Sequence, residues 1–351
     1  MRGKRISAAS DLGDIKGGVP FFNNLPMSFA ARHWYRLSPV SILLVPVGFL
    51  FRFLAALRRL LYRLGALPSA RLRVPVIVVG NLTVGGTGKT PLILALAETL
   101  RRKGRRPGIL SRGYGGALAE PREVSAGDDA AGVGDEPLLL AERSGCPVWI
   151  GADRAAAGRA LLAAHAGCDV ILCDDGLQHY RLRRDFEIAV EDERGHGNGL
   201  PLPAGPLREP ASRRVDATVV NGAEPKPGAF HMRLRPGGFY RVGERLEPVA
   251  RSELSGRRLH AIAAIGNPKR FFEELARMGL NFTAHPFPDH HRFRPADLEF
   301  ADCDLVLMTE KDAVKCRRFG RRDLIAVAVD AEVDPALADL ILERIHGRAP
   351  A

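Results

Sequence analysis

The sequence predicts an α/β protein built around a parallel β-sheet, with a second, smaller α/β domain and an amphipathic helix near the N-terminus. An apolar run at residues 76–79 leads into a glycine-rich turn and then a helix-compatible run at 92–102. A second apolar run, at 169–173, ends in two acidic residues, and strand-like and helical stretches alternate again beyond about residue 221. Such alternation is typical of strand–helix–strand units that share one parallel sheet.

Charge is distributed unevenly along the chain. Hydrophobic residues make up 46% and charged residues 26%, which is ordinary for a globular protein. The formal net charge is +11, and residues 1–70 hold ten Lys and Arg against only Asp11 and Asp14. This asymmetry indicates an anionic partner. The same basic stretch contains an apolar run at 39–57, so we expect a membrane surface and not nucleic acid, which would favour polar residues interleaved with stacking aromatics.

Residues 39–64 predict an amphipathic helix. At about 100° per residue, Arg52, Arg59 and Arg63 share one face, and the leucines at 50, 54, 57, 61 and 64 share the other. The apolar stretch 39–51 is too short to cross ~30 Å of hydrocarbon, and the arginines after it make a longer span costly. An interfacial helix is therefore expected. The leucine stripe also fits a helix packed on the protein's own core, and that alternative stays open.

The five cysteines, at 146, 168, 173, 303 and 316, are odd in number and lack the spacing of a zinc site. We expect reduced, buried thiols in a cytosolic protein.

The glycine-rich turn has the pattern of a nucleotide phosphate loop. Residues 83–90 read Thr-Val-Gly-Gly-Thr-Gly-Lys-Thr, which matches G-x-x-x-x-G-K-[ST] except that Thr83 replaces the first glycine. In such a loop the backbone N–H groups surround phosphate oxygens, Lys89 reaches the β- and γ-phosphates, and the Thr90 hydroxyl serves Mg²⁺. An ordinary glycine-rich turn is the alternative, but the strand before it and the helix after it favour a P-loop.

Polar residues follow other strand-like runs, where ligands gather in an open parallel sheet. Arg112 lies in a glycine-rich turn after residues 107–111, and solvation explains it as well as a phosphate contact does. Asp135 and Glu136 precede a helical run, where capping is the simple explanation. Asp174 and Asp175 end the strand-like run at 169–173, where a P-loop protein needs an acid near Mg²⁺.

Two later loops also carry charged or titratable groups. The long Pro/Gly segment 195–214 contains Arg208 and Glu209, and long aperiodic loops are often functional. In the second half, Asp289 and His290 stand together with His291 after a strand-like stretch, so a carboxylate could orient an imidazole there. Residues 309–312 follow another strand, but their order does not fit a guanine-reading loop.

These features give the expected domain organisation. Residues 1–26 form a disordered extension, 27–70 a membrane-associating helical segment, and 71–225 a P-loop nucleotide-binding domain. Residues 226–351 form the smaller α/β domain, which begins with a hairpin-like linker that turns at 236–238.

Taken together, the motifs resemble those of the tetraacyldisaccharide 4'-kinase family, the lipid A kinases called LpxK. The motifs are GNLTVGGTGKTP at 80–91, SRGYG at 111–115, GDEP at 134–137, DDGLQH at 174–179, LPAGPLREP at 202–210, Asp289-His290, and TEKDAVK at 309–315. They occur in one order over about residues 28–345, and a threonine in place of the first loop glycine is also a family feature.

The resemblance implies a kinase of lipid A synthesis on the cytoplasmic face of the inner membrane, peripheral or anchored by its N-terminal segment. It would use ATP and Mg²⁺ to phosphorylate the 4'-hydroxyl of an acylated glucosamine disaccharide phosphate. The implied roles are nucleotide binding for Thr83, Val84, Gly85, Gly86, Thr87, Gly88, Lys89 and Thr90, metal binding for Thr90, Asp174 or Asp175, and Glu209, and substrate binding for Arg112, Arg154 and Arg208. Asp135 would be the base, paired with His290 by closure of the two domains, and Lys89 would neutralise charge on the transferred phosphoryl group.

Two other classes of protein share some of these features. A membrane-associated P-loop NTPase switch or assembly factor would hydrolyse ATP without phosphorylating a lipid. A basic nucleic-acid-binding ATPase would bind any duplex with steep salt dependence, but the concentration of charge beside an apolar helix argues against it.

Overall fold

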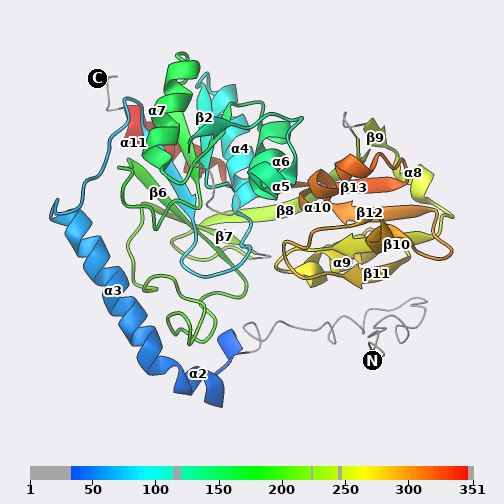
Figure 1. Cartoon of the computed structure of the whole chain (residues 1–351), viewed down its shortest axis with the longest axis horizontal. Coiled ribbons are helices and arrows are strands. Elements are labelled where there is room, and N and C mark those ends of the chain that lie inside the picture. Colours follow the sequence, from blue (N-terminus) through cyan, green and yellow to red (C-terminus); the bar gives the residue numbers. More distant parts are fainter. Residues whose placement is uncertain (1–32, 114–119, 223, 244–246, 347–351) are drawn as a thin grey trace, which may run out of the picture.

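The computed structural model describes residues 33–113, 120–222, 224–243 and 247–346 (Figure 1). The extension expected at 1–26 lies outside the described residues. Within them, the strands join in one continuous sheet with the order β11-β10-β12-β13-β8-β7-β6-β1-β5-β2-β4-β3, and β9 pairs with β8. The predicted α/β class with a mostly parallel sheet is confirmed.

The first half of the sheet contains β1 (Val76–Gly80), β2 (Pro107–Ser111), β3 (Arg122–Glu123), β4 (Val148–Ile150), β5 (Val170–Asp174), β6 (Phe186–Asp192) and β7 (Ala217–Asn221). Its helices are α4 (Lys89–Arg102), α5 (Ala130–Val133), α6 (Asp135–Ser144) and α7 (Arg154–Ala164). The central strands pair in parallel, and only the short β3 runs antiparallel to its neighbour β4. The carboxyl ends of β1, β2 and β5 therefore meet at one edge, as the sequence predicts.

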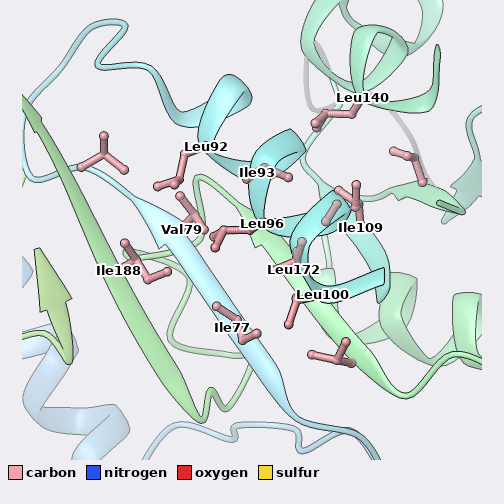
Figure 2. Packing of buried hydrophobic residues seen from close by; sticks show 14 of the residues in the cluster. Ile77, Val79, Leu92, Ile93, Leu96, Leu100, Ile109, Leu140, Leu172 and Ile188 are labelled. Atoms are coloured by element: carbon pink, nitrogen blue, oxygen red, sulfur yellow. The ribbon is translucent and has the colours of Figure 1, made fainter. Parts of the chain in front are cut away.

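Strand β1 is covered on both faces. Because side chains alternate along a strand, Ile77 and Val79 point to the side of α4, where they pack with Leu92 and Leu96 (Figure 2). Val78 joins the core on the opposite face. Burial on both faces explains why the run is continuously apolar. Replacing a fully buried leucine such as Leu96 with alanine would cost about 2–5 kcal/mol.

Strand β8 (Phe230–Arg241) joins the two halves, because it is parallel to β7 and antiparallel to β13 (Leu324–Val333). The turn expected at 236–238 is wrong: these residues lie inside β8. The strand accommodates them with an irregular register opposite Ala328 and Val329. A Cβ at 237 would lie 2.3 Å from Asp330 Oδ2, so a larger residue there would displace that carboxylate.

The second half contains β9 (Glu247–Val249), β10 (Leu259–Ala263), β11 (Phe282–Pro286) and β12 (Leu305–Thr309), with helices α8 (Arg251–Leu254), α9 (Pro268–Arg277) and α10 (Glu310–Cys316) and 3₁₀ turns η2 (Pro295–Leu298) and η3 (Arg317–Phe319). The alternation of strands and helices expected beyond about residue 221 is confirmed, for example by β10 and α9. The last helix, α11 (Pro335–His346), returns to the first half, where Leu337, Ile341 and Ile345 join the core beside α4.

The N-terminal segment forms α2 (Pro39–Leu43) and α3 (Val45–Arg63), and α3 extends along one side of the molecule (Figure 1). It touches the rest of the chain near its two ends: Gly48 packs on Pro201 and Ala204, and Tyr62 lies against Tyr180. Among the described residues, the exposed large hydrophobic side chains all fall between Leu37 and Leu64. The described core thus leaves the apolar face of α3 uncovered. None of the described helices has both the length and the apolarity needed to cross a membrane.

Candidate active site

The P-loop connects β1 to α4 with a tightly packed backbone. Gly88 caps α4 in a left-handed conformation with φ +96°, and a Cβ there would lie 2.6 Å from Asn221 Nδ2. That amide donates a hydrogen bond to the Thr87 carbonyl oxygen at 3.0 Å, which ties the loop to the end of β7. Only glycine fits this position, and the free N–H groups at the start of α4 suit an anion.

Lys89 and Arg208 converge on Asp175. Lys89 Nζ donates to Asn81 Oδ1 at 3.1 Å and lies 3.5 Å from Asp175 Oδ1, while Arg208 Nη1 lies 3.1 and 2.9 Å from the two carboxylate oxygens. Burial raises the pKa of Asp175, but Lys89 and Arg208 outweigh it and hold the pKa below its usual value. Asp175 is therefore ionised, and it holds two cations at the P-loop.

Asp174 is a buried carboxyl with an unpartnered oxygen. Ser111 Oγ donates to Asp174 Oδ2 at 3.3 Å, whereas Oδ1 has no hydrogen-bond partner. Burial, followed by the nearby negative charge of Glu136, raises the pKa of Asp174 to about 7. An orphaned carboxylate oxygen beside a phosphate loop fits a hard divalent cation or one of its waters.

Asp135 and His290 meet across the two halves of the sheet. Asp135 begins α6, His290 lies in the loop after β11, and His290 Nδ1 is 3.2 Å from Asp135 Oδ2. The imidazole must donate, because an ionised carboxylate only accepts. Burial raises the pKa of Asp135, but His290, Lys311 and Lys315 outweigh it and lower it, and the hydrogen bond to Asp135 raises the pKa of His290. The expected meeting of the two side chains is confirmed.

The backbone of His290 is fixed in an unusual conformation. Its φ is +59°, in the left-handed region that few side chains adopt, and its N–H donates to the Ala264 carbonyl oxygen at 3.3 Å. The neighbouring His291 pairs instead with Asp297 at 3.1 Å. The sequence alone could not separate the two histidines, whereas the geometry selects His290 as the partner of Asp135.

One cavity of about 590 Å³ connects these groups. Its lining includes Val84, Gly85, Gly86, Thr87, Gly88, Lys89 and Thr90 of the P-loop region, together with Glu136, Asp175, Arg208, Asp289, His290 and Lys311. Thr83 is buried beside the loop and bridges to Leu207. The volume suits a nucleotide-sized ligand. The phosphate loop and His290 both line the cavity, and Asp135 is in contact with that His290 side chain.

Three residues expected in the site lie elsewhere. Arg112 is exposed at the end of β2, and Arg154 is buried at the start of α7, where Nη1 donates to the Gly151 carbonyl oxygen at 3.4 Å. Glu209 is buried in an ion pair with Arg213 at 2.8 Å and accepts from the Tyr180 hydroxyl at 2.8 Å. Neither Arg112, Arg154 nor Glu209 lines the cavity.

Lys311 is a cavity residue to which sequence reasoning gave no role. Its Nζ donates to Glu136 Oε1 at 3.0 Å. Its position after the strand-like run at 305–308 was a usable signal, because ligands gather at the carboxyl ends of parallel strands.

The described residues hold no cluster of three or more His, Cys, Asp or Glu side chains that could bind a metal by themselves. A cation in this cavity would therefore need oxygens from a phosphate ligand or water besides Thr90 and the aspartates. That coordination is usual for Mg²⁺.

Comparison with known proteins gives one family. The family described as tetraacyldisaccharide-1-P 4'-kinase matches residues 40–346. Curated proteins called tetraacyldisaccharide 4'-kinase are similar along nearly their whole length: that of Azoarcus sp. (strain BH72) is 52% identical over 93% of this chain and 98% of its own, and that of Dechloromonas aromatica (strain RCB) is 53% identical over 91% and 98%. The crystal structure of LpxK from Aquifex aeolicus in complex with ATP has a TM-score of 0.76 at 30% identity, covering 87% of this chain and 99% of that one.

Proposed function

We propose a specific reaction for this chain, which belongs to the tetraacyldisaccharide-1-P 4'-kinase (LpxK) family. The γ-phosphoryl group of ATP passes to the 4'-hydroxyl of a tetraacylated glucosamine disaccharide 1-phosphate. A bond forms between the 4'-oxygen and the γ-phosphorus, the bond to the β–γ bridging oxygen breaks, and ADP leaves. The observation that carries the proposal is the hydrogen bond between Asp135 and His290, since His290 lines the same cavity as the P-loop.

The P-loop region binds the nucleotide in this proposal. Residues 83–90 surround the phosphates, and Lys89 neutralises charge on the phosphoryl group as it moves. Bound Mg²⁺ would neutralise charge on the phosphate oxygens. Thr90, Asp174 and Asp175 fit that ion, since two of them line the cavity and the third has an orphaned oxygen. Glu209 does not fit, because its carboxylate already pairs with Arg213 and Tyr180.

Asp135 acts as the base that takes the proton of the 4'-hydroxyl. Its lowered pKa keeps the carboxylate ionised at neutral pH, and the His290 hydrogen bond fixes which oxygen stays available. Asp135 is almost fully buried, so a hydroxyl that reaches it is shielded from competing water.

The arginines divide by location. Arg208 lines the cavity, which supports a role in binding phosphate or sugar oxygens of the substrate, whereas Arg112 is exposed at the end of β2 and does not line the cavity. Arg154 is buried and lowers the pKa of Asp174 through its charge, which supports a role behind the metal site in place of direct substrate contact.

The helical segment α2–α3 docks the enzyme on the anionic cytoplasmic face of the inner membrane in this proposal. Its exposed apolar side chains would be buried in the lipid interface, and Arg52, Arg58 and Arg63 add exposed positive charge that anionic lipid attracts. A four-chain lipid substrate resides in that surface, so docking would bring the cavity to its acceptor. No role for nucleic acid is proposed.

The experiment is a kinase assay in mixed micelles with γ-labelled ATP, Mg²⁺ and the disaccharide 1-phosphate. We expect a labelled 1,4'-bisphosphate whose formation depends on the acceptor. Folded protein that hydrolyses ATP equally well without the acceptor, and yields no labelled lipid, would contradict the proposal and favour an NTPase switch.

A further inference from the structure

We propose that Lys311 is a positioning residue, whose ammonium group ties Glu136 to Asp289 and thereby holds Asp135 and His290 in register. Lys311 Nζ lies 3.0 Å from Glu136 Oε1 and 3.9 Å from Asp289 Oδ1. Glu136 directly follows Asp135, and Asp289 directly precedes His290. One cation thus bridges the sequence neighbours of both members of the pair, from both halves of the sheet.

The helix that carries Lys311 is itself anchored to both sides of the pair. Glu310 forms an ion pair with Arg143 of α6, and its other oxygen accepts from the Val329 N–H at 2.9 Å. The adjacent Asp312 is fully buried and accepts from the Ala264 N–H at 3.0 Å. These contacts fix the position of Lys311 relative to α6 and to the end of β10.

The backbone of Ala264 links Asp312 to His290. The Ala264 N–H donates to Asp312, and the Ala264 carbonyl oxygen accepts from the His290 N–H at 3.3 Å. The left-handed backbone of His290 is therefore supported from α10, the same short helix that presents Lys311. Backbone contacts orient His290 in this way, while the Lys311 side chain secures the loop against α6.

Charge supports the same role. The groups that face Lys311 are Glu136 and Asp135 from α6 and Asp289 from the loop after β11. Burial lowers the pKa of Lys311, but these three carboxylates outweigh it and raise the pKa above its usual value, so the ammonium persists at neutral pH. Without it, Glu136 and Asp289 would add unbalanced negative charge next to the base.

Lys315, one turn further along α10, does not duplicate this arrangement. Its Nζ pairs with Asp312 at 2.6 Å and lies 4.0 Å from Asp135 Oδ2, with the Phe293 ring 5.0 Å away. Lys315 therefore stabilises α10 itself through its pair with Asp312, whereas Lys311 lines the cavity and bridges the two halves of the sheet.

The inference rests on the proposed function, in which Asp135 is the base. The test compares Lys311→Met with Lys311→Arg in the full chain, using 4'-kinase assays that separate kcat from KM and give a pH profile. We expect Lys311→Met to lower kcat about tenfold to hundredfold with little change in KM for ATP, since small displacements at a reacting centre cost this much. Its acid limb should move to higher pH, because loss of the cation raises the pKa of Asp135. Lys311→Arg should restore most of the rate and the original limb.

Two further variants make the test specific. Lys103→Met removes an ion pair of similar length, to Asp339 at 2.6 Å, between α4 and α11, and should leave kcat and the pH profile unchanged. Placed on an Asp135→Asn background, Lys311→Met should add less than about threefold, since a residue that acts through Asp135 cannot matter once Asp135 is lost.

Each contrary result overturns the inference in a recognisable way. A Lys311→Met enzyme with the wild-type rate and pH profile refutes the role of Lys311 alone. Equal losses from Lys311→Met in the wild-type and Asp135→Asn backgrounds refute action through the base. An Asp135→Asn enzyme with wild-type kcat refutes the proposed base itself, and this inference with it.

Discussion

Asp135 Oδ2 and His290 Nδ1 lie 3.2 Å apart although 155 positions separate the residues in the chain, and they come from opposite halves of one sheet. We expect Asp135→Ala and His290→Ala each to lower kcat by about 10²–10⁴-fold, because each removes part of the group that accepts the hydroxyl proton. Affinity for ATP, measured by equilibrium binding, should change less than about threefold, since neither residue belongs to the P-loop.

The adjacent histidine supplies the control for that experiment. His291 pairs with Asp297 and packs against Phe287 and Phe293, so His291→Ala should affect thermal stability more than kcat. Comparable losses of kcat in His290→Ala and His291→Ala would remove the reason for choosing His290.

The Asp135–His290 pair also predicts a pH dependence of stability. Its hydrogen bond raises the pKa of His290 above 6.5, so its contribution is fully present below that pH and is lost as the pH rises through the folded-state pKa. The Tm difference between wild type and His290→Ala, measured by calorimetry, should therefore be larger at pH 6 than at pH 9. Because the His290 side chain is 39% exposed, we expect the pair to contribute less than about 1 kcal/mol to the free energy of unfolding. A difference that grows with pH would contradict the assigned ion pair.

Asp174 predicts opposite effects on stability and on catalysis. Burial disfavours its charged form, so Asp174→Asn should stabilise the nucleotide-free protein at pH 8 by about 1–3 kcal/mol, seen as a rise in Tm. The same change removes an oxygen suited to the metal, and kcat with Mg·ATP should fall at least tenfold to hundredfold, by about the size seen for metal-site substitutions. Asp169→Asn, at a half-buried ion pair with Arg105 away from the P-loop, is the matched control. An unchanged or lower Tm in Asp174→Asn would show that neighbouring groups already offset the cost of burying the Asp174 carboxylate.

Most of the fold could be predicted from the sequence because its signals are local. The apolar run of β1, the loop glycines and the helix after them have a definite period and order, and each forms as expected. Strand β8 could not be predicted. Residues 236–238 have turn chemistry, but pairing with β13 and the close approach of Asp330 override it.

The candidate site likewise contains some residues that the sequence identifies and others that only the structure reveals. Lys89 and Thr90 are identified by their spacing alone, whereas the partner of Asp135 depends on a contact between distant segments that a single sequence does not encode locally. The family resemblance implies ligand binding for Glu209 and Arg154, and only the structure reveals that both are buried away from the cavity. A role for Lys311 could not be predicted from the sequence, because its two carboxylate partners come from elements far apart in the chain.

Arg194 connects the P-loop to the N-terminal segment. Its Nη2 donates to the Gly86 carbonyl oxygen at 2.7 Å, Asp192 holds the guanidinium, and the Tyr35 ring lies 5.7 Å from it. We expect Arg194→Ala to raise KM for ATP about tenfold to hundredfold, the value of one charge-assisted hydrogen bond, with kcat within about twofold. Arg183→Ala, which loses an exposed contact to Ser69, should leave both constants unchanged. A loss confined to kcat would argue against a role in shaping the loop.

The exposed apolar face of α3 predicts a separation between membrane binding and folding. Phe53 is 63% exposed, so Phe53→Asp should leave Tm within about 1 °C, whereas a helix packed on its own core would lose several degrees from the same change. Binding to vesicles, measured by flotation, should weaken for both neutral and anionic lipid, because the variant lacks an aromatic side chain that would insert into the lipid. Arg52→Gln should weaken binding only to anionic vesicles, since it removes one interfacial charge worth about 1 kcal/mol. If Phe53→Asp lowers Tm strongly and leaves flotation unchanged, the helix covers protein and not lipid, and the docking proposal is wrong.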